Sequence, residues 1–421
     1  MANRDFILLL ITFISFNNYG QIKEASPYSF YGLGTINPNK TSEENTMGGI
    51  GTALSIPNTL NFSNPASLSG ITNTTYSAAG FNKTNQIRDF ESIQRNNTFS
   101  ISYFALAIPL SKKSGLMLGL RDNSNIGYKL TGYDAQDETR NVNYEGSGGT
   151  NNLFLAGGYE IFKNFSVGIE GRLIFGALEH LVIQNQDNIQ YNTRNISTSD
   201  VSGIETRLGL LYKIPINLSE RLGLGITFEN ESKLNITEES KLQKGYPQGN
   251  NNFLPVEQLE TSINQGKAVT PPKITGAVSY GKKQVWETSV EYSYNAPQQF
   301  ENVLLESTTR NISYENYNRL SIGGYYIPKF NSLNDYYKRI TYRYGFKYEN
   351  TGLEKTGESL NDTSFSLGLG LPITRSLNSF NIGLELGRKG KRTETLIEEK
   401  YASLHISIKF ADTWFRKRKI I

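Results

Sequence analysis

Large hydrophobic and polar residues alternate along much of the chain, and the alternation is most regular toward the C-terminus. In residues 404–410 (LHISIKF) every second side chain is a large hydrophobe and each residue between is polar. Residues 380–387, 365–371 and 340–348 follow the same pattern. Such a strand presents one face to lipid and the other to water, so we predict an all-β transmembrane antiparallel β-barrel. A soluble β-sandwich would bury the same apolar faces in a core and is the main alternative.

The alternating segments predict about 14 strands, with short turns at one end and long polar connections at the other. The strands are expected near residues 74–83, 97–110, 115–131, 139–161, 165–180, 199–214, 221–236, 272–281, 285–295, 314–327, 338–350, 362–372, 379–389 and 397–410. The long connections are expected at 83–96, 182–197, 238–271, 296–311 and 389–396. This asymmetry is typical of outer-membrane barrels and argues against the sandwich, as do Trp286, Tyr292 and Tyr344 near strand ends, where aromatic girdles lie.

Both ends of the chain carry information about its location. Residues 1–20 have Arg4, an apolar stretch at 6–16 and a polar end, which is the layout of a secretory signal peptide. The alternative, a membrane anchor, needs about 20 apolar residues. We predict a barrel at 74–410 and a basic periplasmic tail at 411–421. An even number of strands returns the chain to the side of the membrane on which it started, so both termini are expected in the periplasm. The expected location is the outer membrane of a two-membraned (Gram-negative) bacterium.

Residues 21–73 do not have the pattern of strands. They are rich in Gly, Pro, Asn and Ser and are too polar to cross a membrane. The segment is either a periplasmic linker or a plug folded inside the barrel. Two short motifs lie within it, Met47–Ala53 (MGGIGTA) and, further along, Asn64–Leu68 (NPASL).

With these motifs in this order before the first strand, and with residues 410–415 (FADTWF) at the end, the chain resembles the FadL/TodX family of outer-membrane transporters. The resemblance implies a 14-stranded barrel with an N-terminal hatch at residues 21–73. It also implies passive uptake of a hydrophobic small molecule, fatty-acid-like or aromatic, that is captured by outer loops and bound against the hatch. The ligand would then leave sideways through a gap at a kinked third strand.

The resemblance assigns hypothetical roles to particular residues. The hatch or ligand-site residues are Gly48, Gly49, Asn64, Pro65 and Ala66. The residues of the lateral gap are Arg121, Asp122, Asn123, Ser124 and Asn125, where a polar run breaks the alternation of the third strand. Such a break is typical of a β-bulge or inward kink. The alternative is that the strand leaves the membrane at this point and becomes a loop.

A third candidate lies in the connection at 241–271. Pro255 suits the start of a helix, and Val256, Leu259 and Ile263 would then share one face. An exposed apolar helix face is suited to collecting a lipophilic ligand or a protein partner. It would equally suit packing onto the barrel rim.

The sequence offers little material for catalysis. There are two histidines and no cysteine, so cysteine-dependent catalysis, disulfides and a lipid-modified cysteine are excluded. His405 lies between Ser403 and Ser407 on one strand face, which chance explains. We expect no enzyme activity, catalytic residue, metal or cofactor, and the formal net charge of +4 is spread without a basic block in the body, so we expect no nucleic-acid partner.

The leading functional hypothesis is therefore a channel for hydrophobic small molecules, with outer-membrane lipid and a lipophilic compound as partners. The predicted lumen face carries many charges of both signs, which suggests ion pairs that hold a plug. The alternative function is a non-transporting barrel subunit of an outer-membrane secretion or assembly complex, with other outer-membrane proteins as partners.

Overall fold

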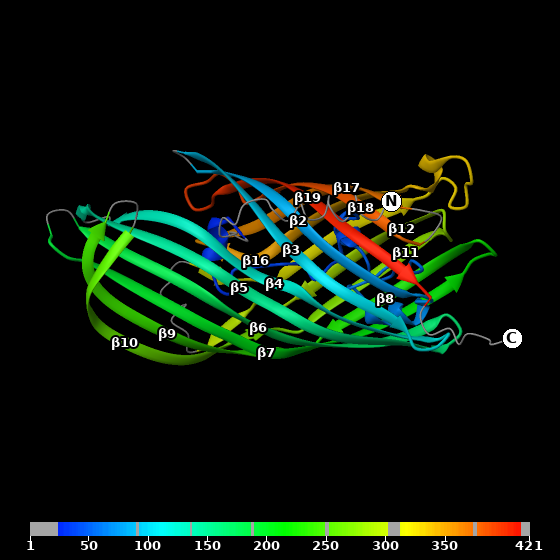
Figure 1. Cartoon of the computed structure of the whole chain (residues 1–421), viewed down its shortest axis with the longest axis horizontal. Helices are drawn as coiled ribbons and strands as arrows, with labels where there is room; N and C mark the ends of the chain where they lie inside the picture. The colour runs from blue at the N-terminus through cyan, green and yellow to red at the C-terminus, as the bar shows by residue number, and fades with distance from the viewer. Residues whose placement is uncertain are drawn as a thin grey trace, which may run out of the picture.

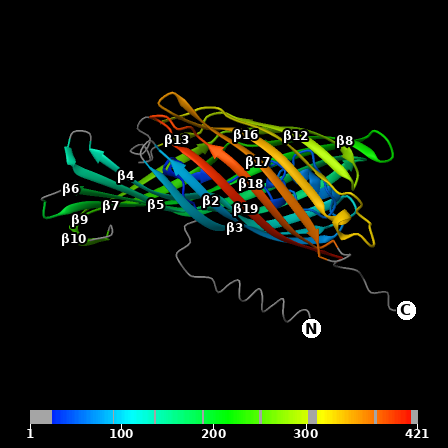
Figure 2. The same ribbon diagram turned by 90° about the horizontal axis from the view of Figure 1, so that it is seen from above.

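The protein is a closed antiparallel β-barrel. The computed structural model describes residues 24–89, 92–134, 137–186, 189–248, 252–301, 312–373 and 377–413. The last strand, β19 (Glu398–Asp412), pairs with β2 (Thr74–Arg88) along its whole length and closes the wall. Figures 1 and 2 show an elongated molecule in which β4, β5, β6, β7, β9 and β10 extend well beyond the other strands at one end.

The wall contains fourteen strands, two of which are each divided into two labelled segments. Its members are β2, β3 (Ile93–Pro109), β4 (Ser114–Asp134), β5 (Asp137–Phe162), β6 (Phe165–Gln186), β7 (Asn192–Pro215), β8 (Glu220–Glu229) with β9 (Ser232–Gln248), β10 (Asn252–Thr270) with β11 (Lys273–Lys282), β12 (Trp286–Asn295), β15 (Tyr317–Tyr326), β16 (Thr341–Lys355), β17 (Glu358–Pro372), β18 (Ser379–Lys389) and β19. The remaining elements are β1 (Thr35–Ile36), β13 (Gln299–Glu301), β14 (Ile312–Tyr314), α2 (Ser42–Asn45) and the 3-10 turns η1 (Pro27–Phe30), η2 (Pro65–Gly70) and η4 (Tyr336–Arg339).

The all-β barrel prediction is confirmed, and each predicted strand overlaps a wall strand. The prediction of long irregular connections is wrong at three hairpins, because β2–β3, β6–β7 and β9–β10 continue as paired strands far into them. Beyond the membrane both faces of a strand contact water or polar groups, so its side chains no longer alternate in polarity. The period-two signal therefore ends before the strand does.

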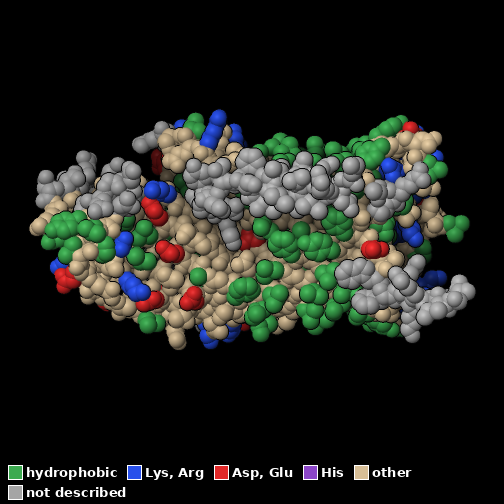
Figure 3. Space-filling model, in the orientation of Figure 1, with side chains coloured by type: hydrophobic (Ala, Val, Ile, Leu, Met, Phe, Trp, Pro, Cys, Tyr) green, Lys and Arg blue, Asp and Glu red, His purple; other side chains and the backbone are tan. Residues whose placement is uncertain are grey.

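The outward face carries an apolar band of the height that a bilayer requires. On β6 the outward side chains are apolar or glycine from Phe165 to Ala177, and Glu179 beyond them is charged and exposed. These thirteen residues are enough for the ~9–11 that a tilted spanning strand needs. Figure 3 shows the hydrophobic side chains gathered mainly over the half with short turns, whereas charges concentrate at the two ends.

We use the name wing for the part of β5–β7 beyond this band together with β9 and β10. The wing stands at the end of the barrel opposite the short turns. No helix in the described part of the chain is long and apolar enough to cross a bilayer.

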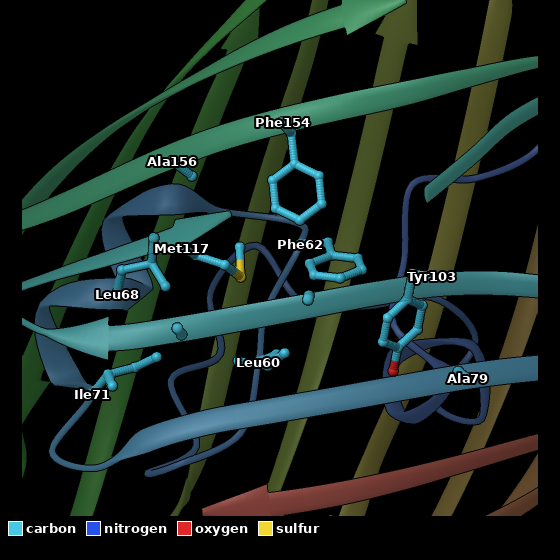
Figure 4. Close-up of a cluster of buried hydrophobic side chains, with 11 residues drawn as sticks. Leu60, Phe62, Leu68, Ile71, Ala79, Tyr103, Met117, Phe154 and Ala156 are labelled. Atoms are coloured by element: carbon cyan, nitrogen blue, oxygen red, sulfur yellow. The ribbon is translucent and has the colours of Figure 1, made fainter. Parts of the chain in front are cut away.

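Residues 24–73, here called the inner segment, lie inside the barrel and are surrounded by its wall. Most of their side chains are buried, and they contact the inward faces of many strands. Figure 4 shows one such contact region, in which Phe62 and Leu68 of the inner segment pack against Met117 and Phe154 of the wall. The predicted signal peptide (1–20) and most of the predicted basic tail (414–421) fall outside the described residues.

Candidate functional site: the inner segment and the seam between β3 and β4

Gly48 and Gly49 adopt a backbone conformation that other residues rarely take. Their φ angles are +68° and +78°. A Cβ on Gly48 would lie 2.7 Å from the carbonyl oxygen of Phe346, and a Cβ on Gly49 would lie 1.8 Å from a guanidinium nitrogen of Arg319. Arg319 in turn donates a hydrogen bond to the Gly48 carbonyl at 2.9 Å. The paired glycines thus allow the inner segment to lie directly against β15 and β16.

Carboxylates fix the middle of the inner segment. Thr41 and Glu44 form a capping box at α2, and Glu44 also accepts a hydrogen bond from Ser63 Oγ at 2.6 Å. Burial raises the pKa of Glu44 above its ordinary value. Glu291 of β12 accepts hydrogen bonds from the Gly51 and Thr52 amides at 3.0 and 2.9 Å and pairs with Lys40 at 2.8 Å. A wall carboxylate therefore binds the segment through its backbone.

The Asn64–Pro65–Ala66 motif connects the segment to the opposite side of the wall. Asn64 caps η2 by accepting from the Ala66 amide at 3.0 Å, and its Nδ2 donates to the carbonyl of Leu210 in β7 at 2.9 Å. The adjacent wall positions Gly158, Gly168 and Gly209 are glycines whose added Cβ would collide with the motif, and a Cβ on Gly115 would collide with the carbonyl of Leu68 just after it. The sequence analysis missed these glycines, although small residues on the inward face of neighbouring strands were a visible signal.

The predicted gap residues lie where β3 and β4 separate. The two strands pair only from Tyr103 with Arg121 to Pro109 with Gly115. Beyond Arg121, the β4–β5 register shifts between Asp122 and Ser124, which places a bulge inside the predicted polar run. Residues 93–102 of β3 and residues 122–134 of β4 have no described pairing with each other, and we call the stretch between them the seam.

The first part of the inner segment covers the edge of β4 at the seam. In this strap (residues 24–37), β1 pairs with Ser124 and Asn125, and the Asn37 amide donates to the Asn123 carbonyl at 2.8 Å. Ser26 and Ser29 bond the backbone of Gly127 at 3.0 and 3.1 Å. The strap therefore supplies pairing or hydrogen-bond partners for the β4 backbone between Asn123 and Gly127, where β3 no longer pairs with it.

The strap is also anchored across the lumen. Glu24 pairs with Lys83 of β2 at 3.3 Å, and the Tyr28 hydroxyl donates to the carbonyl of Ile397 at 2.6 Å. Burial raises the pKa of Tyr28, so this hydroxyl stays protonated. Phe30 and Leu33 pack onto an apolar cluster on the inner wall that includes Ile126, Leu178 and Leu234.

The side chains of the predicted gap are occupied by partners inside the barrel. Arg121 pairs with Glu170 and lies over the rings of Phe62 and Phe154, at 5.1 and 4.3 Å. Asp122 accepts a hydrogen bond from Asn37 Nδ2 at 2.8 Å. The interior beside them is polar: a cavity of about 300 Å³ is lined by Lys40, Arg172, Glu205, Arg207, Glu229 and Arg319, among other residues.

A sequence model of the BamG family matches residues 1–421. The chain belongs to the BamG family. No curated protein matches it.

The BamG-family chain is also similar to solved outer-membrane channels. A Pseudomonas aeruginosa FadL homologue superposes with a TM-score of 0.62 at 11% identity, over 89% of this chain and 99% of that one. The Ralstonia pickettii toluene transporter TbuX gives 0.60 at 13% identity, over 89% and 99%. The P. putida toluene transporter TodX gives 0.59 at 12% identity, over 90% and 100%. The FadL/TodX resemblance is thus confirmed for the fold, which is that of outer-membrane transport channels.

The third predicted site of the BamG-family chain has a different structure. Residues 254–263 lie in strand β10, so the predicted helix is wrong. Val256 and Leu259 are the extra residues at two bulges in the β9–β10 pairing, and with Ile263 they are exposed by 51%, 48% and 67%. Bulges shift the side-chain alternation by one residue, so their apolar spacing imitated a helical period. These side chains lie on the wing, apart from the inner segment and the seam.

His405, the histidine that the sequence placed beside two serines, has an acidic partner in the structure of the BamG-family chain. Its Nε2 lies 3.3 Å from the carboxylate of Glu385 on the neighbouring strand. Within the described ranges, no three His, Asp or Glu side chains are grouped to hold a metal ion. The structural neighbours are channels, which fits a protein that is not an enzyme.

Proposed function

We propose that this chain is a barrel subunit of an outer-membrane secretion or assembly complex, with the wing as its docking surface for protein partners. The observation that carries the proposal is the filled lumen. Within the described residues, the inner segment occupies the barrel, and the residues that line the spaces beside it are mostly of polar or charged types, among them Lys40, Arg319 and Glu349. A site for a hydrophobic compound is expected to be predominantly apolar instead.

The ion pairs of the lumen support a fixed filling. Arg172 contacts Glu229 at 2.5 Å and Glu205 at 3.4 Å, and Arg207 contacts Glu229 at 3.0 Å. Arg207 also donates to the Phe62 carbonyl of the inner segment. These pairs join wall strands to one another, whereas the inner segment itself is held by ion pairs of Lys40 with Glu291 at 2.8 Å and of Glu24 with Lys83 at 3.3 Å. Breaking such buried pairs is costly, so displacement of the segment carries a free-energy penalty.

The wing supplies a surface that a barrel acting alone does not require. β9 and β10 pair with each other over most of their length beyond the apolar band, and Val256, Leu259 and Ile263 are exposed there. Exposed apolar side chains outside the membrane mark an interaction surface. In the proposed complex, these three residues contact the protein partner.

The test compares purification of the tagged chain in mild detergent with that of a Val256→Ser/Leu259→Ser/Ile263→Ser variant. We expect a stoichiometric outer-membrane partner with the parent and loss of it with the variant. A matched control, Leu320→Ser/Ile322→Ser, alters exposed apolar residues within the wall and should retain the partner. A parent that purifies alone, with the variant unchanged, would contradict the proposal.

The same proposal includes a location and an orientation. The apolar band supports an integral outer-membrane position, with the short turns and both termini in the periplasm and the wing outside. Protease added to intact cells should then cut near Leu259 and spare a C-terminal tag. Cleavage of the tag in intact cells would show that the orientation is reversed.

A second candidate, passive uptake of a hydrophobic small molecule with lateral release, is favoured by one observation. The seam lies at the bulged part of β4, where the strap covers the edge of β4 among the residues that the structure describes. In this candidate the inner segment is a hatch, and release of the strap opens a path from lumen to lipid. Its signature is uptake of a lipophilic probe that depends on the protein and is unaffected by the three wing substitutions.

A further inference from the structure

A glycine interrupts a row of large apolar residues on the lipid-facing side of the wall. Register places Leu116, Gly157, Ile169 and Leu208 side by side across β4, β5, β6 and β7, and the row continues to Ile108 on β3 and Phe228 on β8. Every member except Gly157 has a large apolar side chain. A Cβ on Gly157 would find no neighbouring atom closer than 4.0 Å. The position is therefore open space in an otherwise continuous apolar surface.

This interruption is part of a groove toward the short-turn end of the barrel. The groove has a volume of about 500 Å³ and is lined by Leu110, Leu116, Tyr159, Val167, Ile169 and Leu208, together with glycines. On the inner side of the same wall, Gly158 and Gly168 lie directly against Pro65 and Ala66. The groove is thus backed by the packed inner segment, which gives it a fixed floor.

Three lysines lie at the short-turn end of the groove. Lys112 and Lys113 are in the β3–β4 turn and Lys163 is in the β5–β6 turn, and all three are exposed. The turns are neighbours, because the Glu160 amide donates to the Lys113 carbonyl at 2.8 Å. Among the described residues none of these lysines forms an ion pair. Their charges are free to bind an anion at the membrane surface.

We propose that this groove binds an anionic phospholipid, with its phosphate at Lys112, Lys113 and Lys163 and an acyl chain against Gly157. The dimensions agree with this ligand. Six residues separate Lys163 from Gly157, which is roughly 20 Å along a strand. At a tilt of ~40° this is about 15 Å along the membrane normal, a distance that covers the headgroup region and the first part of an acyl chain. The proposal is independent of the function proposed above.

Bulk lipid contacts every outward face of the barrel, so a specific site must prefer one kind of lipid. The positive charge of the three lysines favours an anionic lipid at this groove. Anionic headgroups attract lysines at the surface, and binding should weaken by about fivefold for each lysine removed. Gly276 of β11 offers a comparison, since it also faces outward with no atom within 4 Å of an added Cβ. The β11–β12 turn beside that strand carries Lys282 and Lys283.

The experiment titrates the full-length protein in mild detergent with phosphatidylglycerol and, separately, zwitterionic phosphatidylcholine, and counts bound lipids by native mass spectrometry. We expect saturable binding of phosphatidylglycerol at one site. Gly157→Leu and the Lys112→Gln/Lys113→Gln/Lys163→Gln variant should each weaken it by tenfold or more. Gly276→Leu and Lys282→Gln/Lys283→Gln should leave it unchanged.

Two results would overturn the assignment. One is equal phosphatidylglycerol binding by the parent and both groove variants. The other is unchanged lipid binding together with loss of a stoichiometric barrel partner in Gly157→Leu, which would assign the groove to protein. Heat-modifiable migration in gel electrophoresis checks that each variant is folded. If Gly157→Leu fails to fold, Gly157→Ala places a smaller side chain in the groove and is tested instead.

Discussion

Arg121 of β4 and Glu170 of β6 form an ion pair inside the barrel, with side chains exposed by only 2% and 1%. Arg172 and Arg207 also approach Glu170, each at 3.7 Å. Arg121 is the last β4 residue that pairs with β3, so this carboxylate stabilises the wall where the seam begins.

Glu170→Gln removes the negative charge shared by these three arginines. Because breaking a buried pair leaves uncompensated charge, we expect a loss of about 3–5 kcal/mol in the free energy of unfolding. The measurement is the urea midpoint of heat-modifiable migration in detergent. Glu179→Gln, on the same strand but exposed, should change it by less than about 0.5 kcal/mol. Equal shifts in the two variants would show that the cluster is not stabilising.

Gly48→Ala should displace the inner segment from β16. The substitution combines a φ of +68° with a collision against the backbone carbonyl oxygen of Phe346, so we expect a cost above about 2 kcal/mol. Trypsin cleavage within residues 24–73 should increase. Gly357→Ala is the matched control, because its φ is +81° but no atom lies within 4 Å of the added Cβ. A similar effect of both variants would attribute the result to backbone strain alone.

A disulfide between Ile36→Cys and Ser124→Cys tests whether the strap must leave β4. The two residues are directly paired across an antiparallel ladder, at a spacing that allows a disulfide, and the chain has no other cysteine. For a complex subunit, we expect oxidation to leave partner binding unchanged. For lateral release, oxidation should reduce uptake of a lipophilic probe, and a reductant should restore it.

The control for that disulfide is Thr131→Cys with Asn143→Cys, which joins two wall strands that already pair. Oxidation of this control should affect neither partner binding nor uptake. If the strap disulfide reduces uptake and the control does not, the transport candidate becomes the better account of the chain.

The wing should lose stability in acid through His180. This side chain lies beyond the apolar band and is buried, and its Nδ1 is 2.7 Å from the Tyr128 hydroxyl. Burial lowers the pKa of His180 to about 4, whereas it is ordinarily ~6.5. Below pH 6.5 the unfolded wing takes up a proton that the folded wing excludes, so stability falls as the pH decreases from 6.5 to 4.

Amide hydrogen exchange of residues 177–186, corrected for the intrinsic effect of pH, measures this loss. His180→Gln keeps a polar group but has no titration in this range, so we expect its protection to be nearly constant between pH 7 and pH 4.5. An equal loss of protection in the parent and the variant would assign the acid effect to other groups.

The sequence determined the barrel because lipid imposes a simple rule on every spanning strand. Residues 404–410 alternate strictly since one face meets hydrocarbon, and that requirement is local and readable. The break at Arg121–Asn125 was readable for the same reason, and the structure has a bulge there. Whether residues 24–73 act as a hatch, and whether the seam opens, stay predictions.

Only the tertiary structure decided what the polar residues do. Arg121 and Asp122 gave no sign in the sequence that their partners would be Glu170 and Asn37, because those contacts join distant segments of the chain. Gly157 cannot be distinguished from other strand glycines in the sequence, and only the register places it between large neighbours on the two adjacent strands. Beyond the membrane, no contact with lipid requires alternate side chains to be apolar. The extent of β9 and β10 therefore follows from hydrogen bonding between the two strands and not from a pattern of polarity along each of them.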